Sequence, residues 1–184
     1  MEAAAYADAH QDLVESCRLG DRKAQYSLYK LYVKAMYNAA LRITGDAAEA
    51  EDVVQESFLA AFGNLAAFKG ESTFGSWLKR IVVNNALTVL RKRRLDLQPL
   101  ADWDGVAPAD EVDEEAITFQ VAQVRAGIEK LPAGYRVVLS LYLLEGYDHR
   151  EIADILSISE ATSKTQYLRA KKKLLVLLGG NSDE

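Results

Sequence analysis

The sequence predicts an all-α protein in which two small helical modules are joined by an acidic, flexible linker. Three observations support this fold class. Apolar residues recur at helical spacing in both halves, neither half shows a strand pattern, and an acidic stretch holding two of the three prolines lies between them. We place the first module at residues 1–95, the linker at residues 96–116 and the second module at residues 117–184.

The first module contains three recognisable helices. The first ends at Gly45, and its apolar residues fall at steps of three and four: Leu28, Leu31, Tyr32, Ala35, Met36, Ala39 and Ile43. Asp46 and Glu49 have the spacing of a capping box that begins the second helix. The predicted core residues of that helix are Val54, Phe58, Ala61, Phe62 and Leu65. Ser72 or Thr73 caps a long third helix, which runs into the basic segment Arg91 to Arg94.

The second module has the pattern of a helix-turn-helix. Asp148 and Glu151 form a second predicted capping box, which opens a short helix. Ser157 falls in the tight turn that follows, and Ser159 caps a final helix rich in polar and basic side chains. A short helix, a turn and a polar second helix are typical of this DNA-binding unit.

The net charge of −5 is unevenly distributed along the chain. Residues 96–124 carry 8 acidic side chains and no basic one, whereas residues 1–95 carry 13 Lys/Arg against 11 Asp/Glu, and residues 125–184 carry 9 against 8. Because the acidic excess lies in the middle, an acidic total does not exclude nucleic-acid binding by the modules. Alternatively, the linker acids serve only to keep this segment solvated.

Several functional classes are disfavoured. The longest aliphatic run, Leu174 to Leu178, is too short for membrane insertion, and the start of the chain lacks the features of a signal peptide. With Cys17 as the single cysteine, the sequence favours a cytoplasmic protein. His10 and His149 form no metal-ligand pattern with the acids around Asp52, and no nucleophile–base pair is recognisable. We therefore expect no enzymatic activity, cofactor, metal or small-molecule substrate.

The third helix of the first module presents a mixed polar face. Steps of three and four place an aromatic ring, two cations, an amide and a hydroxyl on one side: Trp77, Arg80, Asn84, Thr88 and Arg91. Such a set suits single-stranded DNA, since rings abut exposed bases and cations hold phosphates. Phe74, Leu78, Ile81, Val82 and Val89 form the predicted core stripe. Phe68 and Trp77 have an alternative interpretation, in which both are core residues.

The final helix also has two faces. Ser163, Tyr167, Ala170 and Leu174 recur at steps of four, three and four and are expected to be buried. Lys164, Thr165, Leu168 and Arg169 then project outward. Lys and Arg donate to guanine acceptors, and Thr165 and Leu168 suit thymine methyl groups. Lys172 and its neighbours Lys171 and Lys173 are expected to contact phosphates.

The motifs together resemble the extracytoplasmic-function (ECF) sigma factors of the sigma-70 family. Residues 50–58 are similar to the polymerase-binding helix of sigma region 2, and residues 68–84 to its promoter-melting part. Residues 131–136 and 164–173 are similar to sigma region 4. The resemblance covers roughly residues 11–95 and 117–178, and it implies a region 2 bundle of three to four helices and a region 4 helix-turn-helix.

The resemblance implies a sigma factor that binds core RNA polymerase and directs promoter-specific initiation at −10 and −35 elements. It assigns Asp52, Gln55 and Glu56 to the clamp helices of the beta-prime subunit, with further contacts to the beta subunit. It places Phe68 and Lys69 at a pocket for a flipped promoter base. An anti-sigma factor is a further expected partner.

Two positions depart from the family pattern. Ser157 stands where glycine is frequent, and Gln166 replaces a common arginine in the expected DNA-reading set, so the promoter sequence stays open. The competing hypothesis is a free-standing helix-turn-helix regulator that binds DNA without polymerase. Against it, the first module carries an acidic protein-binding helix as well as a DNA face.

Overall fold

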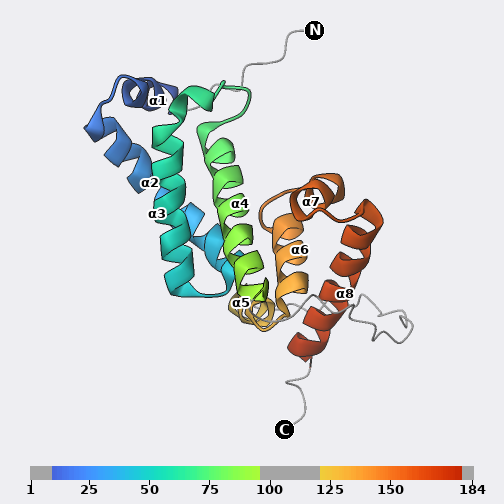
Figure 1. Cartoon of the computed structure of the whole chain (residues 1–184). Helices are drawn as coiled ribbons and strands as arrows, with labels where there is room; N and C mark the ends of the chain where they lie inside the picture. The colour runs from blue at the N-terminus through green and yellow to red at the C-terminus, as the bar shows by residue number, and fades with distance from the viewer. Residues whose placement is uncertain (1–9, 96–120, 180–184) are drawn as a thin grey trace. The chain divides into compact units, whose positions relative to one another are not determined.

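The computed structural model describes residues 10–95 and 121–179, and every regular element within these ranges is a helix (Figure 1). The all-α prediction is therefore confirmed for the described chain. The chain divides into two compact units, residues 1–90 and residues 91–184. The predicted linker, residues 96–116, lies outside the described residues.

The first unit is built from four α-helices and one short 3₁₀ turn: α1 (Gln11–Arg18), α2 (Arg22–Thr44), α3 (Ala47–Gly63), η1 (Leu65–Ala67) and α4 (Phe74–Leu95). Helix α2 packs against α1 and α3. Helix α4 lies beside α3, where Asn85 Nδ2 donates a hydrogen bond to Ser57 Oγ at 3.0 Å (Figure 1). The rings of Tyr32 and Phe74 meet edge to face at 5.5 Å and join α2 to α4.

The helix boundaries follow local capping chemistry. Asp46 Oδ1 accepts from the Glu49 amide at 3.0 Å, and Thr73 Oγ1 accepts from the Ser76 amide at 3.2 Å. Each bond satisfies an amide that has no partner inside the first helical turn. Gly45, with φ of 72°, ends α2 in the left-handed region. The Asp46 half of the predicted capping box is confirmed, while the Asp46 amide donates to Thr44 Oγ1. Thr73 is the residue that caps α4.

The predicted core of the first unit is partly wrong. Leu28, Met36, Ala39 and Ile43 are buried, but Leu31 is 51% exposed and Ala35 is also exposed. The buried line of α2 includes Ala40 and Thr44 in their place. Neighbouring helices pack against α2 along this line, and the residues beside the line, Leu31 and Ala35, are exposed to solvent. Phe62, Ile81 and Val89 are likewise half-buried at the edge of the core.

The second unit contains α5 (Val121–Glu129), α6 (Ala133–Leu143), α7 (His149–Leu156) and α8 (Glu160–Gly179). Helix α8 packs against the other three. Its apolar side joins one cluster: Ile128, Leu131, Leu139, Ala170 and Leu174. Helix α5 packs closely against α8 at Gly127. A Cβ atom added there would lie only 2.7 Å from Leu174 Cδ1.

Helices α7 and α8 form the predicted helix-turn-helix. The capping box is complete, with the Glu151 amide 2.8 Å from Asp148 Oδ1 and the Asp148 amide 3.0 Å from Glu151 Oε2. Ser157 makes the turn with φ of 57°, a left-handed conformation that costs a non-glycine residue about 1–2 kcal/mol. Ser159 Oγ then accepts from the Thr162 amide at 3.0 Å and caps α8.

Candidate functional site

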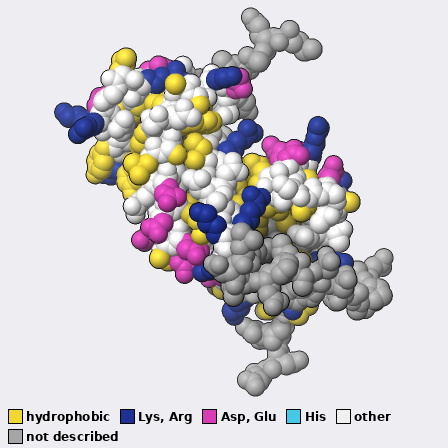
Figure 2. Space-filling model, viewed as in Figure 1, with side chains coloured by type: hydrophobic (Ala, Val, Ile, Leu, Met, Phe, Trp, Pro, Cys, Tyr) yellow, Lys and Arg dark blue, Asp and Glu magenta, His cyan; other side chains and the backbone are white. Residues whose placement is uncertain are grey.

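An acidic face on α3 is the first candidate surface. Asp52, Gln55 and Glu56 are all exposed, as the sequence predicts, while Val54 and Phe58 on the other side are buried. One turn further on, Leu59 is 73% exposed and extends this face with an apolar side chain. In Figure 2 acidic side chains gather over the N-terminal half of α3, with hydrophobic side chains above them. An exposed carboxylate–amide–leucine face suits a protein partner better than DNA.

A shallow cavity adjoins this face. It lies between α2 and α3 and is lined by Tyr29, Val33, Lys34, Tyr37, Glu51, Val54 and Gln55. The sequence prediction identified Gln55 here but not the α2 side, because helical periodicity gives no information on which residues of another helix face it.

The polar face of α4 is the second candidate surface. Arg80, Asn84, Thr88 and Arg91 are exposed along one side of the helix, and Trp77 is half-buried at its start. The Thr88 hydroxyl donates to the Asn84 carbonyl at 2.9 Å. Asn84 is exposed on this face, and its side-chain amide has both donor and acceptor atoms.

Phe68 belongs to an aromatic cluster with Phe74 and Trp77. Its ring centroid lies 5.9 Å from that of Phe74 and 5.4 Å from that of Trp77. Phe68 is only 6% exposed, so the interpretation of Phe68 as a packing residue is the one that the structure supports. Trp77 is intermediate, with one side in this cluster and the remainder accessible. Lys69, next in the chain, is exposed.

An open cavity of about 690 Å³ lies beside this cluster. Its lining comes from α1, the end of α3, η1 and the following loop: Cys17, Arg18, Phe62, Gly63, Leu65, Ala66, Phe68 and Lys69. The guanidinium of Arg18 donates to the Phe68 carbonyl and fixes the start of the loop. The two cations and the apolar wall suit a planar ring with a nearby phosphate. The sequence prediction found Phe68 and Lys69 but missed Cys17 and Arg18, which no motif marks.

Cys17 lines this cavity, but its thiol is not reactive. Burial, with a smaller contribution from the charge of Asp21, raises the pKa of the Cys17 thiol. The thiol therefore stays protonated at neutral pH, where a thiolate would be needed for nucleophilic or metal chemistry.

The outward face of α8 is the third candidate surface. Lys164, Thr165 and Leu168 are exposed, whereas Gln166, Arg169 and Lys172 are half-buried at its margins. Thr165 Oγ1 donates to the Ala161 carbonyl at 2.9 Å, which commits its hydroxyl hydrogen to the helix. On the predicted opposite side, Ser163, Ala170 and Leu174 are buried as expected, whereas Tyr167 is half-buried.

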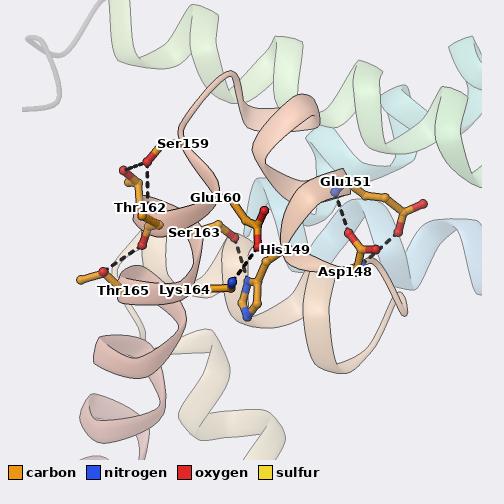
Figure 3. Close-up of polar contacts among 10 residues, drawn as sticks. Asp148, His149, Glu151, Ser159, Glu160, Thr162, Ser163, Lys164 and Thr165 are labelled. Carbon is orange, nitrogen blue, oxygen red and sulfur yellow. Dashed lines mark hydrogen bonds and ion pairs between the residues drawn. The ribbon is translucent and has the colours of Figure 1, made fainter.

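Side-chain contacts from α6 and α7 hold α8 in place. Ser163 is fully buried, and its Oγ lies 3.0 Å from His149 Nδ1 (Figure 3). The imidazole stacks on Tyr142 with centroids 4.5 Å apart and meets the Tyr167 ring edge at 5.5 Å. One part-buried hydrogen bond and three packed aromatic rings thus fix α8 against the other helices of its unit.

The described residues offer neither a cluster of metal ligands nor a membrane-spanning helix. Within residues 10–95 and 121–179, no group of three or more His, Cys, Asp or Glu side chains is arranged to hold a metal ion. None of the described helices combines the length and the apolar composition needed to cross a membrane.

Comparison with known proteins identifies the family. Residues 28–95 match the model "Sigma-70 region 2", and residues 122–174 match "Sigma-70, region 4". The ECF RNA polymerase sigma factor SigW of Bacillus subtilis is 30% identical over 175 residues, covering 88% of this chain and 92% of that protein. The RNA polymerase sigma-H factor of Pseudomonas aeruginosa is also 30% identical over 175 residues. That match covers 89% of this chain and 91% of the Pseudomonas protein.

A solved structure agrees with the sequence matches. CnrH in complex with the cytosolic domain of CnrY is similar over 95% of this chain and 100% of CnrH, with a TM-score of 0.58 and 27% identity. The chain belongs to the ECF group of the sigma-70 family of RNA polymerase sigma factors. It is a transcription initiation factor, and the hypothesis of a free-standing regulator is not favoured.

Proposed function

We propose that this sigma factor binds core RNA polymerase through the acidic face of α3 and directs it to promoters through α4 and α8. The observation that carries this proposal is the exposure of Asp52, Gln55 and Glu56 on α3. These side chains lie outside the buried core, and an isolated DNA-binding module would not need an acidic surface. The beta-prime clamp helices are the proposed contact on the polymerase, and the beta subunit a further one.

The two DNA faces divide the promoter between them. Arg80, Asn84 and Arg91 on α4, together with the half-exposed ring of Trp77, suit the unpaired strand of the −10 element. The cavity beside Lys69 and Arg18 has the size and chemistry for one extruded base. Helix α8 suits the major groove of the −35 element, where Lys164 and Arg169 donate to base edges.

An anti-sigma protein is the proposed regulatory partner. CnrH is solved in complex with the cytosolic domain of CnrY, and its chain is matched here over its full length. The exposed polar and apolar side chains of α3, Glu56 and Leu59 among them, give such a partner a surface shared with polymerase. Competition for that surface would keep the factor inactive. We further propose that it acts in the cytoplasm and without catalysis of its own.

Charge reversal on α3 tests the polymerase assignment. Asp52→Arg with Glu56→Arg should abolish co-purification with core polymerase, because two exposed carboxylates become cations at the contact. The fold should be retained, since exposed substitutions usually change stability by within about 0.5 kcal/mol. The matched control is Asp12→Arg with Glu71→Arg, two exposed acids of the same unit that lie outside α3. Core binding at the wild-type level by a folded α3 variant would refute the assignment.

A further inference from the structure

The first residue of α8 carries a carboxylate on the proposed DNA-reading face. Glu160 Oε1 lies 2.6 Å from Lys164 Nζ, one helical turn along (Figure 3). The Glu160 and Lys164 side chains are 50% and 58% exposed, so both can reach a ligand. Exposed ion pairs of this kind contribute little to stability.

Glu160 is ionised at neutral pH. The hydrogen bond from Lys164, followed by the positive charge of Lys164, holds the pKa of the Glu160 carboxyl below its usual range. An ionised carboxylate only accepts hydrogen bonds. The neighbouring hydroxyls are neutral: Ser159 Oγ accepts from the Thr162 amide, and Thr165 Oγ1 donates its hydrogen to the Ala161 carbonyl. Glu160 is therefore the ionised, exposed acceptor at the start of α8.

Position and charge together restrict what Glu160 can contact. In helix-turn-helix proteins the first residues of the recognition helix approach the base edges. A carboxylate there is repelled by phosphates and by the acceptor atoms of guanine and thymine in the major groove. Adenine presents a donor beside an acceptor, whereas cytosine presents its N4 amino donor alone. Cytosine is thus the base whose major-groove edge matches an ionised Glu160.

We propose that Glu160 is a specificity-determining residue that selects cytosine in the −35 element, with Lys164 holding its carboxylate in place. The lysine ammonium has three donors, so Lys164 can keep its bond to Glu160 and still donate to a neighbouring guanine. This inference rests on the proposed function, in which α8 enters the major groove of the −35 element.

The test is selection of promoter sequences by holoenzyme from a library randomised across the −35 element. Wild-type holoenzyme should favour cytosine over thymine at one position by roughly 5- to 150-fold, the range for one good base contact. Glu160→Gln should move the preference at that position toward adenine, which an amide contacts through N6 and N7, and leave the other positions unchanged. Glu129→Gln, an exposed acid on α5, is the matched charge control and should select the wild-type sequence.

Two results would overturn the proposal in distinguishable ways. If Glu160→Gln keeps the cytosine preference, or changes affinity evenly for all sequences, Glu160 does not determine specificity, and the assignment of α8 as the reading helix is unaffected. If wild-type holoenzyme selects no sequence at all in this element, both the assignment of α8 and the proposal for Glu160 fail.

Discussion

Ser157 shows how one residue shapes the helix-turn-helix. Among the residues that the structure describes, it is the only non-glycine with a positive φ. The sequence alone marks this position, since a two-helix motif needs a sharp turn between Leu156 and Ser159, and serine there is strained. Its left-handed conformation gives a physical reason for the frequent glycine at this position of the family pattern.

Replacing Ser157 by glycine should therefore stabilise the second unit. Removing the left-handed strain gains about 1–2 kcal/mol, and the added freedom of glycine in the unfolded chain returns about 0.4–1 kcal/mol. We expect a net gain of up to about 1.6 kcal/mol in the free energy of unfolding, measured by urea denaturation followed by circular dichroism. Ser157→Ala keeps the Cβ and should behave like wild type. If the Ser157→Gly protein were less stable than wild type, the serine side chain would have to make an interaction that stabilises the fold by more than the strain costs.

At the scale of elements, helix starts and faces were predictable because they depend on local chemistry. The caps at Asp46, Asp148 and Ser159 need only a side chain and an amide within three residues. The buried side of α8 follows from its period alone. Contacts between helices were not predictable, so the burial of Phe68 and the exposure of Leu31 became known only from the structure.

Mutations on the α8 face and on the α4 face should impair different steps of promoter recognition. Lys164→Ala or Arg169→Ala should weaken binding of the −35 element by about 1–3 kcal/mol for a lost bidentate base contact. Asn84→Ala should leave that binding intact but impair strand opening, because its exposed amide lies on α4 instead. Duplex affinity and permanganate reactivity of downstream thymines measure the two steps. Loss of duplex binding alone in Asn84→Ala would contradict this division of labour.

At the scale of the whole molecule, the sequence predicted two helical modules because the charge and the apolar pattern both change near residue 96. It also predicted three separate surfaces on them. It did not predict the cavity beside Lys69, since α1 contributes Cys17 and Arg18 from 50 residues away in the chain. Nor did it predict the pairing of Glu160 with Lys164, because a helical period places two side chains on one face without showing that they bond.

On the proposed function, this chain gives core polymerase its promoter specificity through two DNA faces. Transcription in vitro from a library of random upstream sequences tests it most directly, with transcript starts sequenced in the presence and absence of the chain. We predict that starts appear only with chain and core together, downstream of two enriched sequence blocks at a fixed separation. Asn84→Ala should degrade the block nearer the start, and Arg169→Ala the farther one. The same starts without the chain, or enrichment of one block by the chain without polymerase, would contradict the claim.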